Sequence, residues 1–147
     1  MSKVYHRILS QTAVEIPAGH VAIKTIDMHT GGEPLRVIVD GFPALEGEHV
    51  LAKRRYCKDQ YDHLRTALMF EPRGHADMYG CILTPPNDEE GDFGIIFMHN
   101  EGYSTMCGHA VIAIATLAVQ MNWIDTQEGE NLIKIDAPCG RIEAFVD

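Results

Sequence analysis

The clearest hydrophobic pattern in the chain is a run of small and apolar residues from Ala110 to Met121, interrupted only by Thr116 and Gln120. No polar stripe of helical width is left, so the run predicts a helix that is buried on all sides. It is about a dozen residues long, which is short of the ~20 needed to cross a bilayer. We therefore expect a core helix that the rest of the chain surrounds.

The residues just before this run predict a reactive helix start. Ser104 and Thr105 are good N-cap residues, which would place the next four residues in the first helical turn. The backbone N–H groups of that turn form an anion site, and the helix dipole reinforces it. There the Cys107 thiol should ionise more easily than a free one, Gly108 would let a ligand approach the backbone, and His109 would add a donor or proton relay. The alternative is that Cys107 is simply a small apolar residue of a buried helix.

Six further segments have the alternating or β-branched pattern of strands. They are Val21–Asp27, Pro34–Asp40, Asp77–Thr84, Phe93–His99, Asn131–Asp136 and Arg141–Val146. Between the second and third, Glu48–Phe70 has helical spacing with charges among its apolar positions, which predicts a helix with one wet face on the outside of the sheet. Strands that come in adjacent pairs favour antiparallel pairing. The sequence thus predicts an α+β domain, a mostly antiparallel sheet curled around one buried central helix.

Several polar residues lie in the turns between these elements. His29 and Glu33 flank the glycines of the first hairpin, where they could face a site, although a plain turn is the simpler interpretation. Arg73 and His75 follow the long helix and could bind an anion, but loop exits often carry such residues. The Lys53–Arg55 cluster is interpreted as a solvated helix face.

Length, charge and cysteine usage limit the class of protein. The 147 residues suffice for one domain, in which residues 1–20 are a weakly patterned extension without assigned function and residues 21–147 are the folded part. A net charge of −9 argues against nucleic acid or an anionic membrane as a partner. The four cysteines show no CxxC pairing, and no signal peptide pattern precedes them, so we expect reduced thiols and a cytoplasmic location.

The motifs also limit the chemistry. Cys107 and His109 are two residues apart, and residues so spaced on a helix should not face each other, which argues against a shared metal. No HExxH motif and no glycine-rich phosphate loop is present, so we predict no metal and no nucleotide. An activated thiol beside an anion site serves either acyl transfer or abstraction of a proton next to a carboxylate. Acyl transfer wants a histidine base close to the thiol, and on a helix His109 would be badly placed for that.

Three motifs in order resemble those of the proline racemase family. They are Asp27-Met-His-Thr-Gly-Gly-Glu-Pro34, Glu71-Pro-Arg-Gly-His75 with Asp77-Met-Tyr-Gly80, and Met106-Cys-Gly-His109. The resemblance runs from about Val21 to the C-terminus. It implies one lobe of a diaminopimelate epimerase-like fold, an enzyme without a cofactor, and a small imino acid, proline or hydroxyproline, as substrate. It also implies that Cys107 takes the Cα proton and that Gly108 and His109 contact the substrate.

Within the family the chain looks most like the trans-3-hydroxy-L-proline dehydratases. Leu51-Ala-Lys-Arg-Arg-Tyr56, Asn100–Ala113 and Pro138-Cys-Gly140 resemble that branch, and Ala110 stands where racemases and epimerases usually have glycine. In that branch, loss of the 3-hydroxyl as water would give an unsaturated imino acid. The alternatives are 4-hydroxyproline 2-epimerase, proline racemase, or a non-catalytic lobe that keeps only the fold; an acyl-transfer enzyme is a more distant one.

One difference from the family is large. Members are roughly twice as long, and their second half carries an Asp and a second catalytic position, Cys in racemases and epimerases and Thr in dehydratases. The chain therefore resembles an N-terminal lobe whose partner is a missing C-terminal lobe. Cys139 mimics the second motif but comes too early, so we interpret it as structural. The open face between lobes makes a homodimer a reasonable expectation.

Overall fold

The fold is a six-stranded sheet with one long helix on each face. The computed structural model describes residues 2–11 and 13–147. The elements are α1 (Lys3–Ser10), β1 (Lys24–Thr30), β2 (Glu33–Asp40), α2 (Val50–Met69), β3 (Tyr79–Thr84), β4 (Phe93–His99), α3 (Gly108–Gln120), β5 (Asn131–Ala137) and β6 (Gly140–Val146). The predicted alternation of strand pairs and helices from β1 onward is confirmed, with boundaries shifted by up to three residues.

The sheet is mixed, and its strands lie in chain order from β1 to β6. Each hairpin pair, β1–β2, β3–β4 and β5–β6, is antiparallel. The joins β2–β3 and β4–β5 are parallel, because a helix carries the chain back to the same end of the sheet before the next strand begins. The prediction of a mostly antiparallel sheet did not include these two joins.

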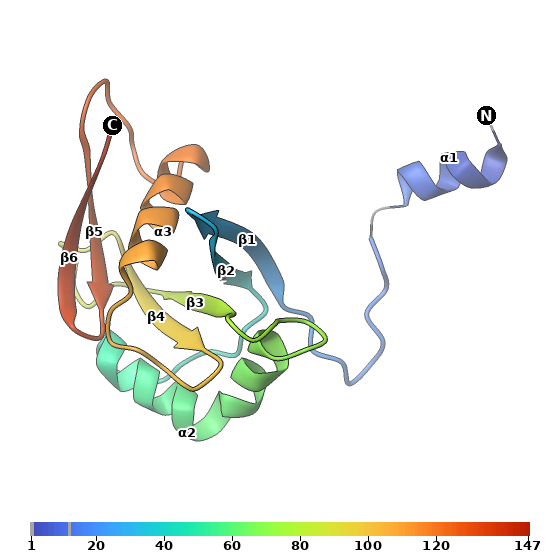
Figure 1. The fold of residues 1–147 in the computed structure, drawn as a ribbon, viewed down its shortest axis with the longest axis horizontal. Helices are drawn as coiled ribbons and strands as arrows, with labels where there is room; N and C mark the ends of the chain where they lie inside the picture. The colour runs from blue at the N-terminus through green and yellow to red at the C-terminus, as the bar shows by residue number, and fades with distance from the viewer. Residues whose placement is uncertain (1, 12) are drawn as a thin grey trace.

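The two crossovers explain why the helices lie on opposite faces. β2-α2-β3 and β4-α3-β5 both step in the same direction across the sheet, but β4 runs opposite to β2. Since such crossovers are right-handed, reversing the strand direction moves the helix to the other face. Figure 1 shows α2 below the sheet and α3 between the two edges of the sheet. α3 contacts β1 and β2 at one edge and β6 at the other.

Both faces of the central strands are buried, which explains the continuous apolar run in β4. Ile95 and Phe97 point into the core under α3, whereas Ile96 and Met98 point into the core under α2. Successive side chains of a strand alternate between the two faces, so in a strand covered on both faces every position tends to be apolar.

The burial of α3 is less complete than its sequence predicts. Seven residues are buried, among them Ala110, Ile114 and Ala118. Ile112, however, is 59% exposed, and the next turns on its side carry Thr116 and Gln120. The prediction of a helix buried all round is therefore wrong for this stripe, which stays open to solvent. Across the described residues, no helix has the length and apolar character needed to span a membrane.

The first residues form a short helix that the sequence analysis did not predict. In α1, the Ser2 hydroxyl accepts the Tyr5 N–H at 3.2 Å and so caps the helix start. All its residues are exposed, and Figure 1 shows it away from the body of the fold. It adds nothing to the core.

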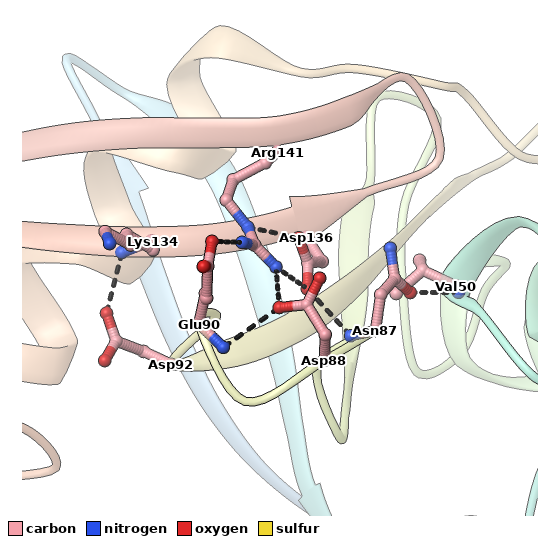
Figure 2. A network of polar contacts seen from close by, with 8 residues as sticks. All are labelled: Val50, Asn87, Asp88, Glu90, Asp92, Lys134, Asp136 and Arg141. Atoms are coloured by element: carbon pink, nitrogen blue, oxygen red, sulfur yellow. Dashed lines mark hydrogen bonds and ion pairs between the residues drawn. The ribbon is translucent and has the colours of Figure 1, made fainter.

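A network of charged and polar side chains surrounds Asp136, which is 1% exposed (Figure 2). Its carboxylate accepts from Arg141 Nε at 2.8 Å and from the Asn87 backbone N–H at 2.7 Å. The Asn87 side chain in turn accepts the Val50 N–H at 2.8 Å, at the first residue of α2. One buried carboxylate thus links the β5–β6 hairpin, the turn between β3 and β4 that contains Asn87, and the start of α2.

Candidate functional site

The site lies at one end of the central strands, where β1 and β4 finish and β2 and β3 begin. A cavity of about 320 Å³ opens there. It is lined by Glu33, by residues 76–79, by His99 to Glu101 and by His109. Glu33, Asp77 to Tyr79 and His109 come from the three separate motifs of the sequence, so the fold brings the motifs to one place.

Cys107 does not sit inside the helix but immediately before it. Its φ and ψ of −149° and 109° are extended, and it is the N-cap residue of α3, which begins at Gly108. The prediction that Ser104 or Thr105 caps the helix is wrong, because the helix begins two to three residues later and its N-cap is Cys107. The Ser104 hydroxyl is 2.6 Å from the Tyr79 hydroxyl, and the Thr105 carbonyl accepts the Cys139 N–H at 3.2 Å.

This extended backbone turns the Cys107 thiol toward His109. The distance from Sγ to His109 Nδ1 is 3.3 Å. The prediction that the two side chains do not face each other is therefore wrong, because it assumed helical geometry at both positions. Two arguments from the sequence relied on that assumption and no longer hold. One was against a histidine partner for the thiol, and the other was against a metal shared by Cys107 and His109.

The contact made by the other ring nitrogen of His109 indicates which of the two nitrogens carries the hydrogen. His109 Nε2 is 3.2 Å from the carbonyl oxygen of Pro34. A carbonyl can only accept, so Nε2 carries the hydrogen, and in a neutral imidazole Nδ1 is then an acceptor. The thiol donates to that acceptor, and transfer of its proton would give a thiolate beside an imidazolium.

Backbone donors complete the helix start. The N–H groups of Gly108, His109 and Ala110 precede the first N–H that bonds within the helix, and in the described part of the chain they have no hydrogen-bond acceptor. Val111 N–H is the first to bond, to the Cys107 carbonyl at 3.0 Å. Together with the helix dipole these donors can hold a carboxylate next to the thiol.

The sequence analysis did not single out Tyr79 as part of the site. Its ring packs edge-on against His109 and stacks with His99, with centroid distances of 5.0 and 5.3 Å. Burial raises the pKa of Tyr79, and the nearby Cys107 raises it further, against the lowering effect of the Ser104 hydrogen bond. Tyr79 therefore stays protonated at neutral pH, which makes it a hydrogen-bond donor in the cavity wall.

Other candidates from the sequence have structural roles. His29 Nδ1 accepts the Gly32 N–H at 3.2 Å within the first hairpin, which is the plain-turn interpretation. Arg73 Nε donates to the Ala67 carbonyl at 2.6 Å and caps the end of α2. The side chain of Asn100 donates to the Met69 and His75 carbonyls and so fixes the loop between them. Of His29, Glu33, Arg73 and His75, the turn residues considered from the sequence, Glu33 alone lines the cavity.

The cysteines are free thiols, as predicted, and only Cys139 is exposed. Cys81 is buried under α3, and burial, with Cys107 nearby, raises its pKa strongly. Within residues 2–11 and 13–147 no group of three or more His, Cys, Asp or Glu side chains is placed to hold a metal ion.

Arg65 holds the segment that leads to Cys107. It is 7% exposed, and Nη1 donates to the carbonyls of His99 and Asn100 at 2.9 and 2.7 Å. Its other nitrogens pair with Asp62 at 2.7 and 2.9 Å. The hydrogen bonds from Arg65 lower the pKa of Asp62.

This pair predicts part of the acid sensitivity of the fold. Because the pKa of Asp62 is lowered in the folded state, its contribution is present at neutral pH and is lost as the pH falls below about 3.9, the ordinary value, toward the folded pKa. Asp62→Asn should therefore narrow the difference in unfolding free energy between pH 7 and pH 3, measured by urea titration. The effect should be modest because Asp62 is 43% exposed. An unchanged difference would show that the pair does not contribute.

The chain belongs to the proline racemase family, whose model matches residues 25–147. Among curated relatives, it is 52% identical over 125 residues to a trans-L-3-hydroxyproline dehydratase of Xenopus tropicalis, covering 84% of this chain and 36% of that protein. It is equally similar, at 52% over 125 residues, to a 3-hydroxyproline 2-epimerase of Burkholderia multivorans, covering 85% of this chain and 37% of the relative. The chain thus spans little more than a third of the length of these relatives.

Solved structures agree on the fold. A hydroxyproline epimerase from Agrobacterium vitis with bound trans-4-hydroxy-L-proline superposes with a TM-score of 0.78 at 24% identity, over 84% of this chain and 36% of that one. A probable proline racemase from Agrobacterium radiobacter gives the same TM-score at 23% identity, over 84% and 37% of the two chains. Each likeness shows a shared fold.

Proposed function

We propose that this chain is the N-terminal lobe of a cofactor-independent enzyme that abstracts the Cα proton of trans-3-hydroxy-L-proline and eliminates water from it. The observation that carries the proposal is the Cys107 thiol, 3.3 Å from an imidazole nitrogen that must be an acceptor, beside the free N–H groups of a helix start. The rest of the enzyme would be a second lobe of a diaminopimelate epimerase-like fold. It would close over the cavity lined by His109 and Tyr79.

The proposed reaction follows from these groups. The substrate carboxylate binds at the N–H groups of Gly108 and His109, next to the positive end of α3. Cys107, as thiolate, takes the proton from Cα, and the electron pair moves toward the carboxylate, where the same donors stabilise the growing charge. The pair then forms a Cα=C3 double bond as the C3–O bond breaks. The leaving hydroxide takes up one proton, and Cys107 releases the proton that it took from Cα, so the net products are an unsaturated imino acid and water.

Epimerisation is the second candidate, because a 3-hydroxyproline 2-epimerase is as similar to this chain as the dehydratase. Both reactions begin with the same proton transfer. They differ in whether a second acid returns a proton to the opposite face of Cα or the hydroxyl leaves first, and that group belongs to the remainder of the protein.

The test is to assay the full translation product on trans-3-hydroxy-L-proline and trans-4-hydroxy-L-proline in D₂O, followed by proton NMR. Loss of the ring C3–H pattern with formation of an unsaturated product is the expected result. Inversion at Cα with deuterium uptake, and no water loss, would replace the dehydratase by an epimerase. Absence of any exchange at Cα would overturn the proposal and leave a lobe that keeps only the fold.

The thiol–imidazole pair can be tested on the 147-residue chain itself. His109→Gln replaces the basic imidazole facing Cys107 by a neutral amide that cannot take up the thiol proton, so alkylation of Cys107 by iodoacetamide at pH 7 should slow by about tenfold. Mass spectrometry of the labelled peptides gives the rate, and the exposed Cys139 in the same sample is the internal reference. Equal slowing at both cysteines, or at neither, would contradict the pairing.

The proposal includes two further expectations about the state of the protein. Free thiols fit a reducing compartment such as the cytoplasm. Met106 and Ile112 leave apolar surface exposed next to the site, at 48% and 59%, which favours self-association of the isolated lobe. Light scattering after size exclusion should give the mass of a homodimer, and Ile112→Ser should shift it to that of a monomer.

A further inference from the structure

A second cavity, independent of the proposed reaction, lies between α2 and the turn that follows β4. Its volume is about 380 Å³. α2 contributes Arg54, Lys58, Asp62 and Arg65, and residues 101–103 form the opposite wall. Glu101 lines both this cavity and the one beside His109, so a single turn separates them.

Two of the charged groups in this cavity already satisfy each other. Arg65 uses Nε and Nη2 for Asp62 and Nη1 for two backbone carbonyls. Hydrogen bonding raises the pKa of Arg65 and lowers that of Asp62. This pair therefore has little capacity left for a ligand.

Within residues 2–11 and 13–147, Arg54 and Lys58 make no direct ion pair, although Lys58 lies near enough to Asp62 for its charge to help lower the pKa of that carboxyl. The two cations are four residues apart on one face of α2, and among the described residues neither takes part in an ion pair. Arg54 Nη2 donates to the Tyr103 carbonyl at 2.6 Å. Its Nε is shielded from solvent, and no acceptor for it is found in the described part of the chain.

This position of Arg54 is a departure from the sequence prediction. The sequence predicts a solvated helix face for the Lys53–Arg55 cluster, but Lys53 and Arg54 are half-buried and only Arg55 of the three is exposed. A buried guanidinium N–H without an acceptor is costly. The cavity lining holds three cations and two carboxylates, in a chain whose net charge is −9. The lining therefore has one more cation than carboxylate, and Arg54 keeps one donor without an acceptor in the described part of the chain, which favours an anion as the ligand.

We propose that this cavity binds a small oxyanion of the phosphate class between Arg54 and Lys58. A guanidinium presents paired donors that match the edge of a phosphate, and a lysine ammonium can reach a third oxygen from the next turn of the helix. Free phosphate and the phosphate group of a small metabolite share this chemistry. The bound anion would contact the turn at Gly102 and Tyr103, which leads to Cys107.

The test is a titration of the ¹⁵N-labelled 147-residue chain with sodium phosphate at constant ionic strength, followed by amide NMR. We expect saturable shifts at Gly102 and Tyr103. Lys58→Gln should weaken binding by about tenfold, and Arg54→Lys, which keeps the charge but loses the paired donors, by a similar factor. Arg55→Gln removes the same charge from the exposed neighbour and should bind as the wild type does.

Either of two results overturns the proposal. One is the absence of saturable shifts at these amides, and the other is equal binding by Lys58→Gln and Arg55→Gln. A parallel titration with glycerol 3-phosphate identifies the source, since tighter binding of the ester than of free phosphate indicates a carried phosphate group. These outcomes do not depend on catalysis, so they are separate from the test of the proposed reaction.

Discussion

Replacing Cys107 by serine in the full translation product will lower kcat for trans-3-hydroxy-L-proline by about 10³, the typical contribution of a positioned base. The thiol is the group that His109 can deprotonate, at 3.3 Å, and it lies beside the backbone donors of α3. A serine hydroxyl at the same position is a far weaker acid than a thiol, so the imidazole cannot generate the oxyanion at neutral pH. The measurement is steady-state kinetics together with deuterium exchange at Cα.

The matched control is Cys139→Ser. Cys139 is exposed on the β5–β6 turn, so this change should leave kcat within about twofold of wild type if its role is only structural. The melting temperature of Cys107→Ser should stay close to that of the wild type, which separates lost chemistry from lost folding. Retention of more than a tenth of the activity by Cys107→Ser would show that another group takes the proton.

The largest effect on stability is expected at Asp136. Asp136→Asn preserves the shape of the side chain but leaves Arg141 facing a neutral amide in the network of Figure 2. Losing a buried carboxylate that accepts three hydrogen bonds should cost about 3 kcal/mol of unfolding free energy. For a chain of this size that corresponds to a melting temperature roughly 6–12 °C lower. Urea unfolding and calorimetry measure the two quantities.

Glu90→Gln is the control for this prediction. Glu90 bonds the same guanidinium, at 3.4 Å, but its side chain is 81% exposed. Because solvent screens an exposed pair, the variant should unfold within experimental error of the wild type. If both variants lose stability equally, burial is not what makes Asp136 important, and the network acts through its net charge instead.

The prediction of the fold succeeded where the local pattern was strong. The apolar run of β4 and the amphipathic α2 were placed within two residues, because burial on both faces or on one face leaves a direct mark on the sequence. α1 was missed, since an exposed eight-residue helix leaves no burial pattern to recognise. The parallel joins were missed because pairing between β2 and β3 depends on how α2 returns the chain, which no local pattern records.

The candidate site shows the same division. Cys107, Gly108 and His109 were identified from residue type and from the three motifs, but their relation was wrong. That relation depends on two dihedral angles at Cys107, which place it before the helix and turn its thiol to Nδ1 of His109. The tautomer of His109 depends on the Pro34 carbonyl, 75 residues away in sequence.

The sequence by itself determined the core elements, the family and the choice of Cys107 as the candidate cysteine, because periodicity, residue chemistry and motif order are properties of the chain. Only the tertiary structure decided which groups act on which. In the folded chain Tyr79 packs against His109, and Arg73 caps the end of α2. Nε of Arg54 is buried without an acceptor in the described part of the chain. The physical reason is that hydrogen bonds and charge interactions act over a few ångströms, and contacts at that distance arise from packing segments that are far apart in the sequence.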